Sequence, residues 1–151
     1  MQLLAVRFLN LLMAGLVAGT LLGISLGYNP KNLSALAYLE QQQNAIKALN
    51  TLMPILGFIT IVITLTSAFL QKSNKTIFIV LLVATAFLII SGLVTRLGNQ
   101  PINSMVMNWG NADMPADWIS LRDKWWTFHI VRTITTVTAF GLIIGASLRK
   151  G

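Results

Sequence analysis

The chain has 151 residues, of which 55% are hydrophobic and 10% are charged, with a formal net charge of +7. Soluble domains carry roughly 25% charged residues, so this composition excludes a soluble globular protein and predicts one integral membrane domain over residues 1–151. The basic residues are scattered between apolar runs, which argues against a nucleic-acid partner. The sequence contains no cysteine, which excludes disulfides and thiolate chemistry.

Four apolar runs predict four membrane-spanning helices, at about residues 3–26, 53–70, 77–94 and 128–148. Each run is close to the roughly 20 residues that a helix needs to cross the hydrocarbon core of a bilayer. The first run is too long for a signal-peptide core and has no small-residue cleavage site after it, so we interpret it as a retained helix. The predicted fold is therefore an all-α, up-down four-helix bundle, whose two long loops lie at one end and carry short helices.

The loop charges predict the orientation of this bundle. The short second connection contains Lys72 and Lys75 without an acidic residue, and the C-terminus contains Arg149 and Lys150, also without one. The two long loops are nearly balanced in charge. Because Lys and Arg accumulate on the cytoplasmic side, both termini are expected in the cytoplasm, with a bacterial inner membrane as the expected location.

The first run carries four glycines at a strict four-residue spacing. Glycines with this spacing share one helix face and let another backbone approach closely. The pattern fits packing inside the bundle, and it also fits formation of a homo-oligomer or a membrane complex through this face. The glycines are Gly15, Gly19, Gly23 and Gly27.

The first long loop contains an amphipathic segment, residues 34–54, that is predicted to be helical. Ser34 is a suitable N-cap, and Pro54 marks a kink or a restart at the beginning of the second span. The polar cluster at residues 41–44 fits a solvated face, or else one or two of its amides point into the mouth of the bundle.

Residues 99–103 (NQPIN), after the third span, are typical of a turn. This segment is interpreted either as a helix-ending loop or as a site where Asn99 and Asn103 are buried, order the mouth and contact a ligand. A short helix over residues 102–109 is expected to follow.

The segment RDKWWTFHIVR (122–132) enters the fourth span. At 3.6 residues per turn its polar and aromatic side chains fall on one stripe, which predicts a helix that begins near Pro115 and projects beyond the bilayer. Charged residues inside a span normally face the protein interior. Arg132 fits an anion or carbonyl clamp in a cavity, or else a snorkelling or structurally paired arginine near the interface. The stripe consists of Trp118, Arg122, Trp125, His129 and Arg132.

His129 is the only histidine of the chain. With no cysteine and no carboxylate inside a span, no metal site is expected, because such sites need several good donors. The ring suits proton transfer or hydrogen bonding instead. The tryptophans also fit an interfacial aromatic belt.

The glycine-rich first span, the Asn-x-Pro-x-Asn motif and the Arg-x-x-Trp-x-x-x-His-x-x-Arg motif together resemble the anthrone oxygenase-like family of small membrane proteins. The resemblance covers most of the chain, and its distinctive part is residues 99–132. It implies oxidation of a phenolic anthrone by dioxygen without a cofactor. On residue chemistry, His129 is predicted to act as base with Arg132 beside it, as the two catalytic residues. The predicted substrate-binding residues are Asn99, Asn103, Arg122 and Trp125.

Three functions therefore stay open. The first is a cofactor-independent oxygenase that acts on an aromatic or quinol-like molecule at the outer end of the bundle. The second is a non-catalytic membrane subunit or scaffold that packs through its glycine face. The third is a carrier site for a small molecule without chemistry.

Overall fold

The computed structural model describes residues 2–110 and 114–149, and the chain there is helical with short connections. Four stretches of helix are long and apolar enough to cross a membrane, which makes this an integral membrane protein. The elements in chain order are α1 (Gln2–Gly27), the 3₁₀ turn η1 (Pro30–Asn32), α2 (Ala35–Leu49), α3 (Leu52–Leu70), α4 (Lys75–Val94), the π-helical turn η2 (Thr95–Asn99), α5 (Gln100–Val106) and α6 (Trp118–Leu148).

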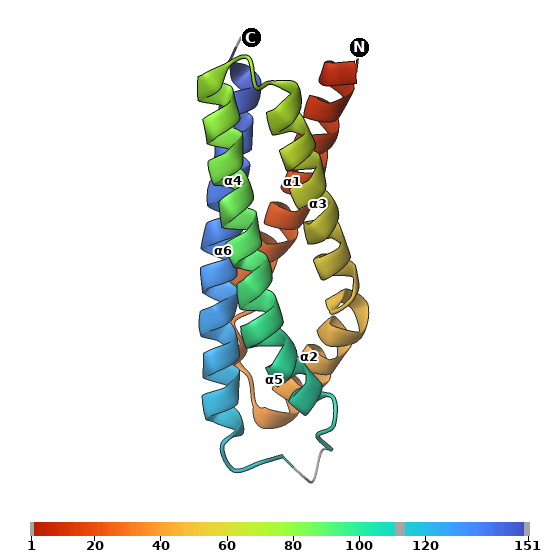
Figure 1. The fold of residues 1–151 in the computed structure, drawn as a ribbon. Helices are drawn as coiled ribbons and strands as arrows, with labels where there is room; N and C mark the ends of the chain where they lie inside the picture. The colour runs from red at the N-terminus through yellow and green to blue at the C-terminus, as the bar shows by residue number, and fades with distance from the viewer. Residues whose placement is uncertain (1, 111–113, 150–151) are drawn as a thin grey trace.

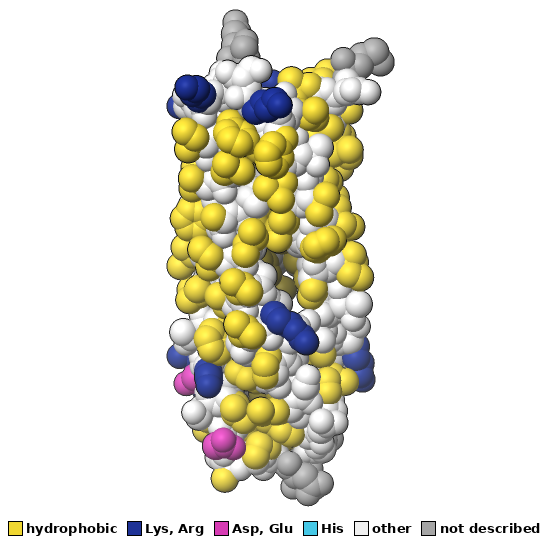
Figure 2. Space-filling view, viewed as in Figure 1, with side chains coloured by type: hydrophobic (Ala, Val, Ile, Leu, Met, Phe, Trp, Pro, Cys, Tyr) yellow, Lys and Arg dark blue, Asp and Glu magenta, His cyan; other side chains and the backbone are white. Residues whose placement is uncertain are grey.

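The long helices form the predicted up-down bundle (Figure 1). Both chain ends and the α3–α4 connection lie at one end, called here the termini end, while α2 and α5 lie at the other, called the α2/α5 end. Around the bundle the order is α1, α3, α4, α6, with each helix packed against the next. Hydrophobic side chains cover the middle of the visible surface, and Lys and Arg side chains lie toward both ends (Figure 2).

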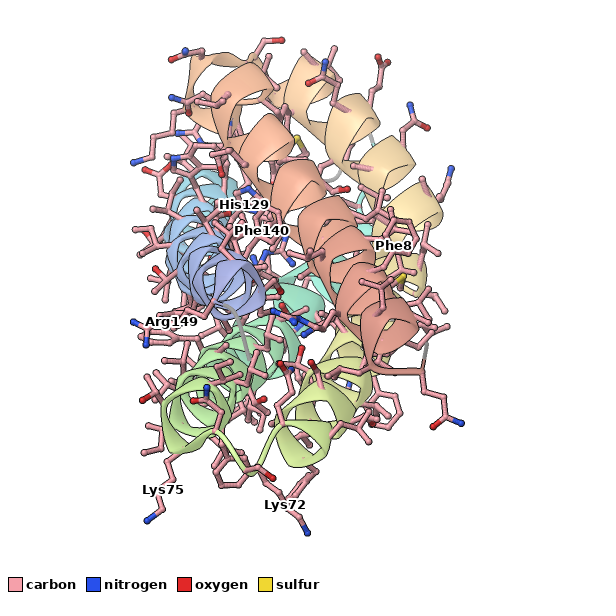
Figure 3. The ribbon with its side chains drawn as sticks, turned by 90° about the horizontal axis from the view of Figure 1, so that it is seen from above. Phe8, Lys72, Lys75, His129, Phe140 and Arg149 are labelled. Atoms are coloured by element: carbon pink, nitrogen blue, oxygen red, sulfur yellow. The ribbon has the colours of Figure 1, made fainter. Side chains whose placement is uncertain are left out.

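Small side chains hold the helices together toward the termini end. Ala14, Ala68, Ala84 and Ala139 are almost fully buried and pack with larger aliphatic residues such as Ile143. Small residues allow close helix approach, which drives association where lipid is as apolar as the interface. Lys72 and Lys75, beside the tight α3–α4 connection, point away from the bundle (Figure 3).

Arg7 has a structural partner at this end. Its guanidinium donates hydrogen bonds to two of the last carbonyls of α6, those of Ala146 and Ser147, and to that of Arg149 just after the helix. The last carbonyls of a helix have no intrahelical partner and carry a partial negative charge. Arg7 therefore caps the C-terminus of α6 from the first turns of α1.

The predicted turn at residues 99–103 is wrong, because the helix does not end there. Instead α4 continues through the π turn η2 into α5, and the N–H of Gln100 bonds to the carbonyl of Thr95, five residues back. The wide turn fits Pro101, which lacks an N–H for the ordinary helical bond. Gly98 lies in this turn, where a Cβ would come within 2.7 Å of the Phe128 ring on α6.

The amphipathic segment forms α2, and Ser34 caps it as predicted: its Oγ accepts a hydrogen bond of 3.4 Å from the N–H of Ala37. The helix breaks at Asn50 and Thr51, and α3 restarts with Pro54 in its first turn. The buried face of α2 packs on α5 and α6 through Leu39 and Ile46.

The helix α6 is 31 residues long and begins at Trp118, three residues after Pro115. The predicted stripe faces the interior, since Arg122, Trp125, His129 and Arg132 are all buried. Trp126, beside Trp125, is half-buried.

The glycines of α1 divide into two groups. A Cβ on Gly15 would lie 3.3 Å from the Phe140 ring, so this glycine packs inside the bundle. At Gly19, Gly23 and Gly27, no atom of the described chain lies within 4 Å of the position that a Cβ would take.

Candidate functional site

His129 and Arg132 lie together on the inner face of α6, one turn apart. The Arg132 guanidinium donates to His129 Nδ1, with Nε at 3.2 Å and Nη2 at 2.9 Å. His129 is fully buried between α6 and α1 (Figure 3). Its ring stacks on Trp125 at 5.2 Å between centroids.

The hydrogen bonds fix the tautomer of His129. A guanidinium only donates, so Nδ1 must accept and the neutral ring carries its proton on Nε2. Nε2 lies 3.0 Å from Ser25 Oγ on α1, and Ser25 in turn donates to the carbonyl of Leu21. Both ring nitrogens are therefore occupied. A role of His129 as base requires Arg132 to leave Nδ1.

Arg132 is a buried cation without an anionic partner. It is 9% exposed, its Cζ lies 5.8 Å from the centre of the Trp125 ring, and no carboxylate of the described residues lies within 4.0 Å of its guanidinium. Buried charges are normally paired, because an unpaired one is costly to desolvate. The partners of Arg132 among the described residues are the neutral ring of His129 and the face of the Trp125 ring.

Arg132 lines a cavity of about 280 Å³ at the α2/α5 end. We call this the ring cavity. Aliphatic side chains from α1, α2 and α3 form much of its wall, and polar groups converge on it from α2, α5 and α6. Such a mixture of apolar walls and few polar groups is typical of small-molecule sites. Its polar lining comprises Tyr28, Gln41, Gln42, Asn50, Thr95, Asn103, Trp125 and Arg132.

Gln42 is one of the residues around the ring cavity, and its side chain has an unpaired donor. Its side chain is fully buried, and Tyr28 Oη donates to its Oε1 at 3.0 Å. Its Nε2 has no hydrogen-bond partner among the described residues. A buried amide N–H without a partner costs about 1–3 kcal/mol, so its retention calls for an explanation such as a ligand oxygen.

The other amides of the 41–44 cluster behave differently. Gln43 donates to the carbonyls of Val106, at the end of α5, and of Trp109 just after it, while Gln41 and Asn44 are exposed. Both interpretations of the cluster therefore hold in part: two amides are exposed, and Gln42 is buried beside the ring cavity.

Asn103 belongs to a polar chain along the ring cavity. Trp125 Nε1 donates to Asn103 Oδ1 at 2.8 Å, and Asn103 Nδ2 donates to Asn50 Oδ1 at 2.8 Å. Asn50 in turn accepts a bond from Gln100 on its carbonyl. The network fixes the Trp125 indole as a wall of the cavity and links the end of α2 with α5 and α6.

Three predicted residues do not line the ring cavity, and His129 is one of them. Asn99 is fully buried and donates from Nδ2 to the carbonyl of Trp125 at 3.0 Å, which joins η2 to α6. Arg122 pairs with Asp123 at 3.0 Å and lies over the Trp118 ring. These contacts are those of residues that hold the site together.

Tyr38 lies beside the same group, fully buried and stacked on Trp118 at 5.7 Å between centroids. Burial raises the pKa of its hydroxyl to about 12, while the nearby charge of Arg122 acts in the opposite direction. The hydroxyl has no hydrogen-bond partner among the described residues.

Sequence reasoning missed Ser25, Tyr28 and Asn50 as site residues. Ser25 and Tyr28 stand in or just after an apolar helix, and no spacing rule ties them to α2 or α6. Their roles depend on how α1 crosses the bundle, which is a tertiary property.

The sequence model of a protein family described as anthrone oxygenase matches residues 43–142 of the chain. The matched range contains every site residue predicted from the sequence, whereas Ser25, Tyr28 and Gln42 precede it. Comparison with curated proteins and with solved structures gave no match.

Proposed function

The chain belongs to the anthrone oxygenase family, and we propose that it binds a phenolic aromatic molecule as its anion in the ring cavity and promotes oxidation of that molecule by dioxygen. The observation that carries the proposal is the pairing of two donors at one cavity: the unpartnered Nε2 of Gln42 and the guanidinium of Arg132, which has no acid beside it. Both groups are hydrogen-bond donors, and an anionic ligand in the ring cavity would supply the acceptor that they lack.

Such an oxygen is stabilised most where water is excluded. Donors fixed in a low-dielectric site act more strongly than in water and need no reorganisation during the reaction. The Arg132 guanidinium donates a hydrogen bond to His129, and the side-chain oxygen of Gln42 accepts one from Tyr28. The donors are therefore oriented before a ligand arrives.

The chemistry follows from the charge. An anthrone that loses its proton to water before it enters the cavity gives an anion with electron density on the ring carbon, which can react directly with dioxygen. One oxygen atom ends as the new carbonyl and the other leaves as water, so the anthrone loses two hydrogens and becomes an anthraquinone. Stabilisation of the anion by Arg132 and Gln42 increases its population, which is the contribution required of the protein.

We assign His129 to positioning. With Nδ1 occupied by Arg132 and Nε2 facing Ser25, its contacts act on the direction of the guanidinium rather than on the ring cavity. The role of base that the sequence suggested is the competing assignment. The two assignments differ in one expected result. A side chain that keeps an acceptor at the Nδ1 position preserves turnover if His129 positions Arg132, and abolishes turnover if His129 is the base.

The experiment compares anthrone-dependent oxygen uptake and ligand binding in purified protein in nanodiscs. Gln42→Leu removes the free donor and should lower affinity for the anthrone roughly tenfold, as expected for about 1.4 kcal/mol. Gln43→Leu is the matched control: it removes two bonds from α2 to the end of α5 and to Trp109 just after it, and should lower thermal stability while affinity stays unchanged.

Equal affinity in wild type and Gln42→Leu would overturn the assignment of the anion site. Binding without oxygen uptake in the wild type would indicate a carrier site without chemistry.

A non-catalytic subunit is the second candidate. The observation that favours it is the open face of α1 at Gly19 and Gly23. Gly19→Leu should then abolish oligomerisation or co-purification of a partner, whereas an unchanged elution volume in detergent would count against this candidate.

For location we propose a bacterial inner membrane with both termini cytoplasmic, on the strength of the charge at Lys72, Lys75 and Arg149. The chain has no cysteine, so a single Lys72→Cys or Asp117→Cys variant reports one end each. An impermeant thiol reagent applied to intact cells should label the Asp117→Cys variant alone. Labelling of Lys72→Cys alone would reverse the orientation.

A further inference from the structure

A second cavity, of about 240 Å³, adjoins the ring cavity on the side of α3 and α4. We call it the tail cavity. Five residues line both cavities, so the two share a junction. The shared residues are Leu21, Met53, Pro54, Thr95 and Arg132.

The tail cavity lies where the surface has an opening between α3 and α4 (Figure 2). Gly57 on α3 and Gly92 on α4 line it, and at each of them the position of a Cβ is free of contacts within 4 Å. Phe58, beside Gly57, is 67% exposed on the lipid-facing surface. The tail cavity therefore connects the junction with the bilayer.

The two cavities differ in the hydrogen-bond partners of the polar side chains that line them. Apart from Arg132 at the junction, every polar side chain that lines the tail cavity already has a partner in the protein. Ser91 donates to the carbonyl of Arg132, Thr136 donates to Ser91, and Thr95 donates to the carbonyl of Ser91. Arg96 donates to Gln100 Oε1, and its side chain is exposed at the surface. In the ring cavity, by contrast, the Nε2 of Gln42 has none.

We propose that the ligand is an amphiphile that arrives from the bilayer: a phenol or hydroquinone whose oxygenated ring occupies the ring cavity and whose apolar tail passes the junction and lies in the tail cavity between α3 and α4. The inference rests on the proposed function. A chamber with satisfied polar groups and an opening toward lipid accepts an alkyl chain without leaving a buried donor unpaired.

The test uses a para-alkylphenol that carries a photoactivatable diazirine in its tail, with wild-type protein in nanodiscs and para-cresol as the competitor without a tail. After illumination, mass spectrometry locates the label. The expected sites are the tail-cavity residues of α3 and α4, such as Phe58 and Leu88, and excess para-cresol should remove this label.

Gly57→Leu fills the tail cavity and should lower the competed labelling roughly tenfold, which corresponds to about 1.4 kcal/mol of binding free energy. Affinity for para-cresol should stay unchanged. Gly92→Leu fills the same cavity from α4 and should give the same loss. The matched control is Gly141→Leu, an equally open glycine that lines neither cavity, and it should label like the wild type.

The outcomes separate the two proposals. If para-cresol binds but the competed label lies only in the ring cavity, or only on lipid-facing positions outside both cavities, the tail inference is overturned while the proposed function stands. If para-cresol does not bind the wild-type protein, the proposed function fails and the tail inference fails with it.

Discussion

The two ends of the bundle use membrane-buried residues in opposite ways. Toward the termini end, alanines and aliphatic side chains close the interior, and the polar side chains there are paired, as in the bond of 2.7 Å from Thr64 to Asn10. At the α2/α5 end the helices enclose two cavities, and the interior keeps a cation without an acid and an amide without an acceptor. The first end is built for stability, and the second retains polar groups that lower stability unless a ligand satisfies them.

The largest expected effect comes from removal of the Arg132 charge at the α2/α5 end. Arg132→Met keeps much of the side-chain volume and removes the charge, so affinity for a phenolate should fall at least about 30-fold, or about 2 kcal/mol. Arg132→Lys should retain part of the affinity, because it keeps a charge but loses the planar fork. Equilibrium dialysis measures both. Full affinity in Arg132→Met would mean that the ligand does not bind as an anion.

The next effect is on stability, and it concerns the packing of η2 against α6. Gly98→Ala places a Cβ about 2.7 Å from the inner atoms of the Phe128 ring, and the forced shift should lower the free energy of unfolding by about 1–3 kcal/mol. The matched control is Gly92→Ala in the same continuous helix, where the space is open and the higher helix propensity of alanine should stabilise the protein. Thermal unfolding in detergent compares them. Equal melting temperatures of the two variants would contradict the prediction that η2 requires a glycine at position 98.

Two variants of His129 distinguish a positioning role from a role as the base. His129→Ala should lower anthrone turnover by roughly tenfold, since about 1.4 kcal/mol is a reasonable scale for a misdirected donor. In His129→Asn, the amide oxygen can replace Nδ1 as the acceptor for Arg132, so turnover should recover toward the wild-type value. The pH profile of turnover in His129→Asn should match that of the wild type. Loss of activity in both variants would restore His129 as the base.

The smallest expected effect is on stability, from a variant at the termini end. Arg7→Met removes the cap on the last carbonyls of α6, and stability should fall by about 0.3–1 kcal/mol, the usual scale of a charge at a helix terminus. Ligand affinity should not change, because the contact lies at the opposite end of the bundle. A change in affinity would show that the two ends are coupled.

Patterns within one helix were predictable from the sequence. The spans, the cap at Ser34 and the buried stripe of α6 depend on local periodicity and on side-chain chemistry, and the structure confirms them. The stripe located Arg132 and Trp125, which line the ring cavity.

Features that depend on a second helix were not predictable. Asn-Gln-Pro-Ile-Asn is typical of a turn, yet the π turn keeps it helical because Gly98 packs against Phe128 and Asn99 bonds to α6. Gln42 and Gln43 are chemically identical neighbours, and only the packing of α2 decides which one is left unpaired. The partner of Arg7 lies at the other end of the sequence.

The central claim is that the ring cavity holds a phenol as its anion, and the ionisation of a bound chromogenic phenol tests it most directly. A nitrophenol absorbs differently as phenol and as phenolate, so its pKa can be read by titration of the absorbance in the presence of protein in nanodiscs. The account predicts that the pKa of the bound phenol lies well below its value in empty nanodiscs, and that Arg132→Met abolishes the shift. A bound phenol whose pKa is unchanged or raised would contradict it.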